Sequence, residues 1–298
     1  MQKKMIEGRE ILCMEDTDIK RLLPPRDAYA HKGNFGKVTI VAGAEGYTGA
    51  PTLAAKACLR CGSGLVFTLV PRAVYPIVAG RLEEAMVFPM PCDAQGRFSQ
   101  EAAVPVLERI NLSTCALVGP GLGRSSALTQ LVAFLLPRAQ CPLILDADGL
   151  NALEGHIDIL REVAVSPILT PHDGEFARLY GRMPDPRKRS DRIDCAMALA
   201  RKAHAIVLLK GHRTIITDGD AVYVNFTGNP GMATGGSGDV LAGMLAALVG
   251  QGLPGLEAAA LAAYLHGKAG DVCAAAMGQV GLLPGDMIAA LPRLFLEG

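Results

Sequence analysis

A stretch of small residues that ends in an acid lies directly before a long apolar segment near the C-terminus. It reads Thr-Gly-Gly-Ser-Gly-Asp over residues 234–239, and the apolar segment after it predicts a helix. The N-terminus of a helix carries about half a positive charge and binds anions such as phosphate oxygens. Asp239 then has two interpretations, a helix N-cap or a base that takes a proton beside a bound anion. Glycines that leave room for a ligand favour the second interpretation.

Glycine and polar residues also follow several of the apolar runs that predict strands. In an open parallel sheet, ligands bind outside the carboxyl ends of the strands. We therefore expect the segments after these runs to converge on one crevice. These segments are GAEGYTGAP at residues 43–51, GPGLGRSS at 119–126, DADGLN at 146–151 and TPHDGE at 170–175.

Two common phosphate-binding loops do not fit the sequence. A Walker A loop needs Ser or Thr after Gly-Lys, but the Gly-Lys pairs at 36–37 and 267–268 are followed by other residues. The Rossmann GxGxxG pattern is matched only in part by the run from Gly119, because its third glycine falls on Arg124 or Ser126.

The elements that position these loops alternate between strands and helices along most of the chain. Several runs are apolar throughout, which is typical of strands buried on both faces in a parallel sheet covered by helices. We therefore predict an α/β fold that is doubly wound, with a mostly parallel central sheet and helices on both faces. Two short runs joined by Asp218-Gly219 predict a β-hairpin, and residues 238–298 are predicted to be almost entirely helical. The predicted strands are 37–43, 65–71, 116–119, 142–148, 166–170, 205–211 and the hairpin runs 214–219 and 221–226; the predicted helices include 99–110, 125–136 and 191–203.

The charge balance and the hydrophobic content limit the partners and the location that we expect. Lys and Arg number 29, as do Asp and Glu, so no net field draws the chain to nucleic acid or to an anionic membrane. Half of the 298 residues are apolar, yet no run reaches the roughly 18 apolar residues of a membrane span. The first residues lack the apolar region of a signal peptide. We expect a single cytoplasmic domain over residues 1–298, with 1–23 as an N-terminal extension packed on it.

Cys58 and Cys61 form a Cys-x-x-Cys pair that could be half of a zinc site or a redox pair. No second pair follows to complete four zinc ligands. Both cysteines fall on the core-facing side of a helix predicted from Pro51, so we interpret them as buried thiols. Eight cysteines in 298 residues without a secretory signal are expected to be reduced.

Six motifs, in this order along the chain, resemble those of the ADP/ATP-dependent NAD(P)H-hydrate dehydratases, a family of the ribokinase-like superfamily. They are HKGNFG (31–36), GPGLG (119–123), LDADGLN (145–151), TPHDGE (170–175), LLKGHRT (208–214) and NPGMATGGSGDVLAG (229–243). The resemblance implies a ribokinase-like three-layer fold and the repair of hydrated NADH or NADPH (NADHX or NADPHX). In this family a nucleotide phosphorylates the 6-hydroxyl of the hydrate, and loss of phosphate restores the reduced cofactor. Many relatives carry a fused epimerase domain that is missing here, so only the dehydratase activity is expected.

The resemblance also implies roles for individual residues. Asp239 would contact the 6-hydroxyl and act as the base, while the N–H groups of residues 236–238 would stabilise the transferred phosphoryl group. Without the joint match of motifs, simpler interpretations would hold: surface positions for residues 210–213, a loop histidine bonded to the backbone, and glycines required by close packing. The expected nucleotide-binding residues are Lys210, Gly211, His212, Arg213, Thr214, Gly236, Ser237 and Gly238, and the expected hydrate-binding residues are Ala50, Gly121, Gly123, His172 and Asp239.

Magnesium is expected with the nucleotide, because this ion bridges phosphates and keeps most of its waters. Ribokinase relatives place an Asn-x-x-Glu motif near the metal, and the corresponding stretch here runs from His172 to Glu175. Glu175 is therefore expected to act on the metal indirectly. Ala233 stands where ribokinases carry Asp before the Thr of their base motif, which argues against a sugar kinase.

Other functions stay open at this point. A ribokinase-like kinase for a vitamin precursor such as hydroxyethylthiazole or hydroxymethylpyrimidine would release a stable phosphorylated product. A non-catalytic nucleotide sensor would keep the loops without turnover, but the presence of Asp239 argues against it. No motif separates ADP from ATP or NADHX from NADPHX, although a stand-alone domain favours ADP. A homo-oligomer is expected from related proteins.

Overall fold

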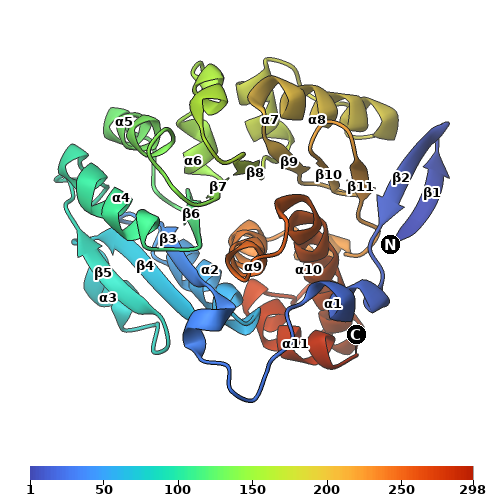
Figure 1. The fold of residues 1–298 in the computed structure, drawn as a ribbon, viewed down its shortest axis with the longest axis horizontal. Coiled ribbons are helices and arrows are strands. Elements are labelled where there is room, and N and C mark those ends of the chain that lie inside the picture. The colour runs from blue at the N-terminus through green and yellow to red at the C-terminus, as the bar shows by residue number, and fades with distance from the viewer. Residues whose placement is uncertain (298) are drawn as a thin grey trace.

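One eleven-stranded sheet runs through the middle of the molecule and separates two layers of helices (Figure 1). The structure is a computed structural model that describes residues 1–297. Neighbouring strands are parallel along most of the sheet, in the spatial order β9-β8-β7-β6-β3-β4-β5. These strands are β3 (Lys37–Val41), β4 (Leu65–Pro71), β5 (Met86–Met90), β6 (Cys115–Val118), β7 (Leu143–Leu145), β8 (Ile168–Leu169) and β9 (Ile206–Leu209).

Beyond β9 the sheet changes direction. β10 (Ile215–Thr217) pairs antiparallel with β9 and with β11 (Val222–Val224), and β11 pairs parallel with β2 (Arg9–Cys13). β1 (Gln2–Ile6) completes an N-terminal hairpin with β2 and forms the edge of the sheet. The predicted hairpin at Asp218-Gly219 is present, but four residues connect β10 to β11, because Thr217 pairs with Val222.

The sequence analysis did not predict three of these strands, β1, β2 and β5. β1 is almost entirely exposed and mostly polar, so it lacks the apolar pattern that identified the central strands. β5 is apolar throughout and mostly half-buried, but it contains Pro89, which argues against a strand. The N-terminal hairpin extends the sheet through the pairing of β2 with β11, and α1 (Asp16–Leu22) follows the hairpin.

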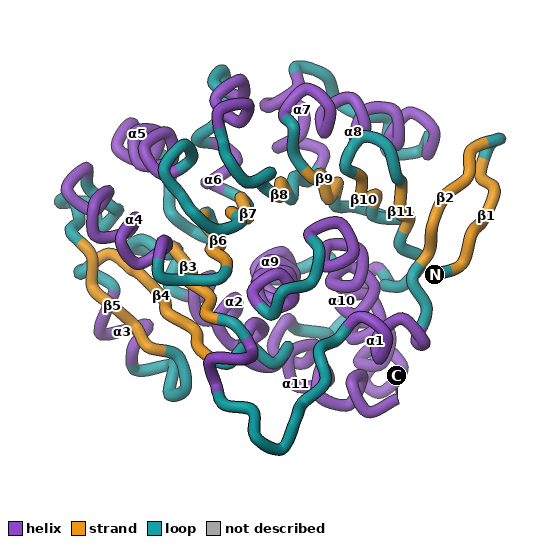
Figure 2. Tube along the Cα trace, viewed as in Figure 1, coloured by secondary structure: helices purple, strands orange, loops and turns teal. Residues whose placement is uncertain are grey.

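The helices form two layers, one on each side of the row of strands (Figure 2). Each layer packs its own set of buried apolar side chains against one face of the sheet. The predicted three-layer α/β class with a mostly parallel sheet is confirmed. One layer contains α4 (Ala103–Asn111), α5 (Ser126–Leu135), α6 (Asp148–Asn151), α7 (Asp173–Tyr180) and α8 (Arg189–Ala203); the other contains α1, α2 (Gly49–Arg60), α3 (Tyr75–Ala79), α9 (Ser237–Gly250), α10 (Gly255–Met277) and α11 (Pro284–Glu297).

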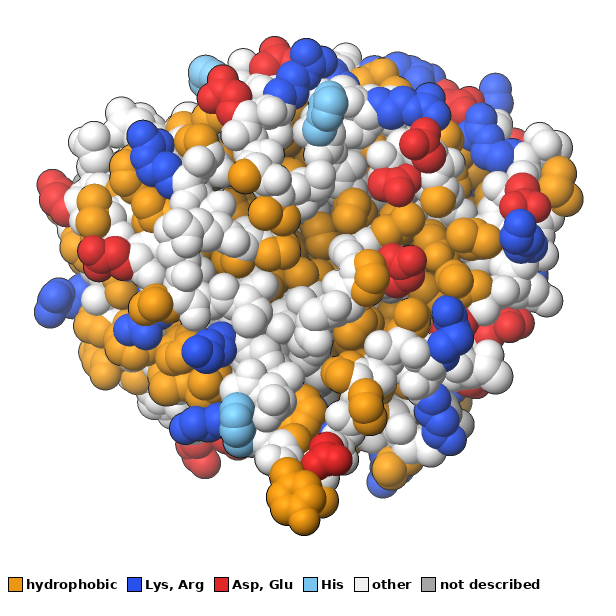
Figure 3. Space-filling view, viewed as in Figure 1, with side chains coloured by type: hydrophobic (Ala, Val, Ile, Leu, Met, Phe, Trp, Pro, Cys, Tyr) orange, Lys and Arg blue, Asp and Glu red, His pale blue; other side chains and the backbone are white. Residues whose placement is uncertain are grey.

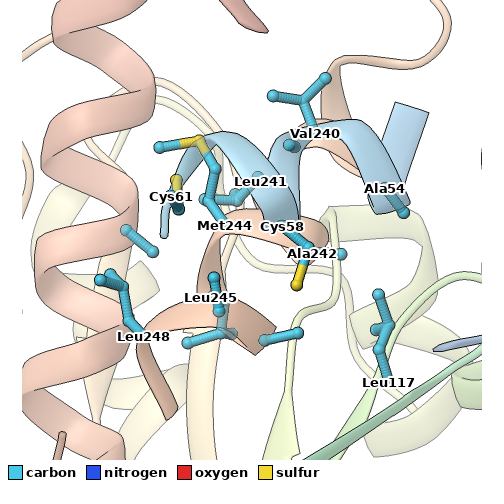
Figure 4. Close-up of a cluster of buried hydrophobic side chains, with 14 of the residues drawn as sticks. Ala54, Cys58, Cys61, Leu117, Val240, Leu241, Ala242, Met244, Leu245 and Leu248 are labelled. Atoms are coloured by element: carbon cyan, nitrogen blue, oxygen red, sulfur yellow. The ribbon is translucent and has the colours of Figure 1, made fainter. Parts of the chain in front are cut away.

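Helix α9 is buried on nearly all sides, as its almost uninterrupted apolar sequence requires. Its side chains meet those of α2 and β6 in the core shown in Figure 4. A Cβ at Gly243 would lie 2.8 Å from the carbonyl carbon of Ala54, so only glycine lets α2 and α9 approach this closely. In the described part of the chain, no helix has the length and hydrophobicity needed to cross a membrane.

Cys58 and Cys61 lie in this core as free, buried thiols. Cys58 Sγ is 3.1 Å from Ser63 Oγ, and burial raises the pKa of the Cys58 thiol to about 12. Burial likewise raises the pKa of Cys61. A thiol that stays protonated at neutral pH is a poor nucleophile and a poor metal ligand.

Candidate active site

The start of α9 includes a glycine, Gly236, that another residue could replace only with strain. Gly236 is the N-cap residue, with φ at +95°, and a Cβ there would lie 2.5 Å from Leu53 Cδ1. The first turn begins with Ser237, so Asp239 is the third residue of the helix and the N-cap interpretation does not hold. The Ser237 N–H donates to the Thr234 carbonyl at 3.3 Å. The first-turn N–H groups concentrate the positive end of the helix dipole beside Asp239.

Lys210, just after β9, joins two buried carboxylates to this turn. Its Nζ lies 2.7 Å from Asp146 Oδ1 and 3.7 Å from Glu175 Oε2. A Cβ at Gly238 would lie 3.7 Å from the same Nζ, so the ammonium group lies against the first turn of α9. Asp146 is 2% exposed and also accepts a hydrogen bond from Thr170 Oγ1 at 2.7 Å. The ends of β7, β8 and β9 therefore meet α9 at one cluster of charges.

Burial and the charges of this cluster together set the protonation of Asp239. Burial raises the pKa of Asp239 to about 7; the negative charge of Asp146 acts in the same direction, and Lys210 opposes both. Burial alone would lower the pKa of Lys210, but Asp146 and Glu175 outweigh it and raise that pKa. Lys210 therefore stays charged at neutral pH while Asp239 titrates there. A carboxyl group with its pKa near the working pH is suited to accept and release a proton.

A cavity of about 890 Å³ opens beside the cluster and is lined by the loop between β9 and β10, the segment between β11 and α9, and the helices α9 and α10. Its volume falls within the range of about 300–1,000 Å³ typical of small-molecule sites. The lining includes Lys210 and Arg213 but no acidic side chain, which suits an anionic ligand. Every residue expected to bind a nucleotide lines the cavity except Gly236, and His172 joins them. The sequence analysis missed further lining residues, among them Asn225, Thr227, Asn229, Met232, Leu241 and His266.

The turn after Lys210 is fixed to the hairpin rather than left free in solvent. Arg213, with φ at +60°, donates from Nη1 to the Phe226 carbonyl at 2.6 Å, and its guanidinium lies 4.6 Å from the centre of the Phe226 ring. Thr214 Oγ1 donates to the Gly211 carbonyl at 3.0 Å. These contacts hold the rim of the cavity in one shape.

The expected hydrate-binding residues Ala50 and Gly121 lie next to each other. Gly121 has φ at +63°, and a Cβ there would lie 3.1 Å from Ala50 Cβ and 2.8 Å from Tyr47 Cβ. Gly123 donates its N–H to Asp148 Oδ2 at 2.8 Å. None of these glycines lines the large cavity, but Leu53, one turn after Ala50 in α2, reaches Gly236. The start of α2 thus connects this second region to the start of α9.

His172 and Glu175 form a capping box at the start of α7. His172 Nδ1 accepts the N–H groups of Gly174 at 3.0 Å and of Glu175 at 3.3 Å, and Glu175 Oε2 accepts the His172 N–H at 2.8 Å. His172 is therefore bonded to the backbone through Nδ1, as the simpler interpretation of a loop histidine expected. The imidazole is nevertheless 54% exposed and lines the cavity. Glu175 is 5% exposed and reaches Lys210 as described above.

A buried arginine that the sequence analysis did not identify holds the turn that follows Lys210. Arg192 in α8 is 3% exposed; it pairs with Asp173 at the start of α7 and donates from Nη2 to the Lys210 carbonyl at 3.0 Å. A Cβ at Gly211 would lie 2.8 Å from that Nη2. No motif could have revealed this residue, because its role depends on the packing of α8 under β9.

The donor groups of the site include two buried carboxylates, Asp146 and Glu175. Within residues 1–297, no group of three or more His, Cys, Asp or Glu side chains is arranged to hold a metal ion. The carboxylate oxygens of Asp146 and Glu175 are of the kind that Mg²⁺ accepts, directly or through its water ligands. Glu175 and Asp146 are the carboxylates that would lie near it.

Sequence comparison decides between the families that share this architecture. The sequence model of the NAD(P)H-hydrate dehydratase family matches residues 38–293, most of the chain. The chain belongs to the NAD(P)H-hydrate dehydratase family. The family resemblance inferred from the six motifs is thereby confirmed.

Two relatives of the chain carry names that belong to this family. A bifunctional NAD(P)H-hydrate repair enzyme of Moorella thermoacetica is 48% identical over 91% of the chain, which spans about half (51%) of that relative. The ADP-dependent (S)-NAD(P)H-hydrate dehydratase of Neisseria meningitidis is 36% identical, and the match covers 95% of the chain and 93% of that protein.

Solved structures of NAD(P)H-hydrate dehydratases and their relatives share the fold. An ADP/ATP-dependent NAD(P)H-hydrate dehydratase of Bacillus subtilis, co-crystallised with ATP and Mg²⁺, superposes with a TM-score of 0.79 at 29% identity and covers 96% of the chain and 98% of its own. A ribokinase-like superfamily protein of Enterococcus faecalis gives a TM-score of 0.81 at 27% identity, covering 99% and 98%. The expected ribokinase-like fold is confirmed.

Proposed function

We propose that this chain uses ADP or ATP to dehydrate NADHX and NADPHX and so restores NADH and NADPH. The observation that carries the proposal is the position of Asp239, with a pKa of about 7, in the first turn of α9 beside a cavity suited to an anion. The names of the relatives in Neisseria meningitidis and Bacillus subtilis support the reaction and the nucleotide. The equal numbers of acidic and basic residues favour these small-molecule partners over nucleic acid or a membrane. We place the activity in a cytoplasmic homo-oligomer.

The proposed reaction begins with transfer of the terminal phosphoryl group of the nucleotide to the 6-hydroxyl of the hydrate. Asp239 takes the hydroxyl proton as the new P–O bond forms and the bond to the nucleotide breaks. First-turn N–H groups of α9 and the Lys210 ammonium stabilise the charge on the phosphoryl oxygens. Departure of phosphate from C6 and loss of a ring proton then restore the double bond.

Two further parts of the site are assigned within the same proposal. Ala50, Gly121 and Gly123 would hold the hydrate, with His172 at the border of the nucleotide cavity. Mg²⁺ bound with the nucleotide would neutralise phosphate charge, and Glu175 would orient its water ligands.

The assay that tests this function supplies the purified chain with NADHX, Mg²⁺ and either ADP or ATP. Recovery of the near-ultraviolet absorbance of reduced nicotinamide with either nucleotide is the expected result. Accumulation of a phosphorylated product without that recovery would instead support a small-molecule kinase. No reaction with either nucleotide would contradict both enzymatic functions.

The pH dependence of kcat/KM follows from the pKa of Asp239. A base must be unprotonated, so kcat/KM is expected to fall as the pH drops below about 7. In Asp146→Asn the negative charge that helps to raise this pKa is gone, and the acidic limb should move to lower pH. Burial, the larger cause, is unchanged, so the limb should stay above the ordinary Asp value of 3.8. Rates between pH 5 and 9 check this, and an unmoved limb would exclude Asp146 from tuning the base.

A further inference from the structure

A buried histidine faces the nucleotide cavity without a part in the chemistry described so far. His266 lies in α10 and is 9% exposed, and its Nε2 is 3.3 Å from Ser237 Oγ. Both side chains line the cavity, and Ser237 is the first residue of α9. The Ser237 hydroxyl therefore stands at the positive end of a helix, in a cavity whose lining has no acidic side chain.

His266 is uncharged under ordinary conditions. Burial lowers its pKa to about 4; a backbone hydrogen bond at Ser237 partly opposes this, and the Lys210 charge adds to the lowering. A neutral imidazole carries one N–H donor and one bare nitrogen acceptor. His266 consequently cannot hold a phosphate by charge, and its influence depends on which nitrogen carries the hydrogen.

The tautomer of His266 decides whether the Ser237 hydroxyl turns its hydrogen or its lone pairs toward the cavity. When Nε2 is bare, the Ser237 hydroxyl donates its hydrogen to the imidazole and turns its lone pairs toward any anion in the cavity. When Nε2 carries the hydrogen, it donates to Oγ, and the hydroxyl hydrogen is free for a phosphate oxygen. Only the second arrangement lets the Ser237 hydroxyl donate a hydrogen bond to a bound phosphate.

We propose that His266, in its Nε2–H form, is a positioning residue that orients the Ser237 hydroxyl as a donor to the terminal phosphate of the nucleotide. The inference rests on the proposed function for the identity of the ligand. It assigns His266 no contact with the reacting atoms. The chain of donors from imidazole to hydroxyl to phosphate strengthens each bond, because the hydroxyl is polarised when it accepts and donates together.

The test measures the dissociation constant of ADP with Mg²⁺ by calorimetry for four variants: His266→Leu, His266→Gln, Ser237→Ala and the double variant His266→Leu/Ser237→Ala. A hydrogen bond to a charged group contributes about 1.5–3 kcal/mol, so each of His266→Leu and Ser237→Ala should weaken binding by roughly 10- to 100-fold. The double variant should bind no more weakly than Ser237→Ala alone, because the histidine acts only through the hydroxyl. His266→Gln, whose amide N–H can replace Nε2–H, should stay within about threefold of the wild type.

Controls separate this pattern from a general structural effect. Val272→Ala removes a side chain that is 39% exposed on the same helix and should leave ADP binding unchanged. Should His266→Leu fail to fold, His266→Asn, whose amide ends nearer the backbone, takes its place in the cycle. Independent losses in the double variant, or wild-type binding in the His266 variants, would overturn the proposal. A wild type that binds ADP but does not dehydrate NADHX would contradict the proposed function and leave this binding test intact.

Discussion

Asp239→Asn is expected to lower the turnover of NADHX by about 10²- to 10⁴-fold, the usual contribution of a general base. Asparagine keeps the size of the side chain but cannot accept the hydroxyl proton. The acidic limb near pH 7 should also disappear from the residual rate, because the group that titrates there is gone. The initial rate at saturating ADP and Mg²⁺ gives the comparison, and an unchanged rate would remove Asp239 from the mechanism.

The same variant should be more stable than the wild type at high pH. The pKa of Asp239 rises from 3.8 to about 7 on folding, so the folded state disfavours the charged form. The resulting cost is absent below the ordinary value, grows between the two values and is complete above pH 7. Asn carries no such charge. We expect Asp239→Asn to raise the free energy of unfolding by about 1–3 kcal/mol at pH 8, and by less at pH 5.

Urea unfolding of both proteins at the two pH values measures this difference. Asp220→Asn is the matched control, since its carboxyl group is 94% exposed and pairs only loosely with Arg201 at 3.4 Å. That control should change neither activity nor stability appreciably. Lower activity together with higher stability is typical of a functional residue held in an unfavourable environment. A loss of stability at pH 8 would instead mark Asp239 as a structural residue.

The central part of the fold could be predicted from sequence because its strands are buried on both faces. A run such as residues 65–71 is apolar except for Thr68, and the observed β4 spans it. The N-terminal hairpin escaped prediction because its strands carry mixed or exposed residues. β5 is apolar throughout, but Pro89 within it argues against a strand. Edge strands are recognised by their pairing partners, which sequence patterns do not identify.

The site was predictable where its function depends on backbone and motif, and less so where it depends on tertiary contacts. The glycine-rich turn before Asp239 and the stretch from Lys210 to Thr214 were identified, and the structure brings them to one cavity and its border. Arg192 and His266 were not identified, because each acts through a neighbour from another element. Figure 3 shows acidic and basic side chains interspersed on this face of the molecule, which agrees with local rather than global attraction of anions.

The GPGLG segment allows a second large effect to be predicted, this time on stability. Gly119 has φ at +143°, and a Cβ there would lie 2.7 Å from the carbonyl carbon of Asp146 and would overlap its oxygen. Gly149, three residues after Asp146, lies against the same backbone: a Cβ there would lie 3.2 Å from Gly119 Cα. The ends of β6 and β7 thus approach each other through glycines on both sides, and the carbonyl is backbone that cannot turn away.

Gly119→Ala should therefore lower the free energy of unfolding by about 4 kcal/mol or more, the level reached when packing and backbone strain combine. Gly155→Ala is the matched control, because its φ of +76° is also unfavourable for alanine but no atom lies within 4 Å of the added Cβ. It should cost only about 1–2 kcal/mol. Urea unfolding of the two variants separates the clash from the conformational cost.

Gly119→Ala also links stability to the site, because relief of the clash must move the backbone of Asp146, whose carboxylate holds Lys210 at 2.7 Å. Any folded Gly119→Ala protein is therefore expected to bind ADP more weakly than Gly155→Ala. If the two variants lose equal stability, the unfavourable φ alone explains the cost at Gly119 and the close packing contributes nothing.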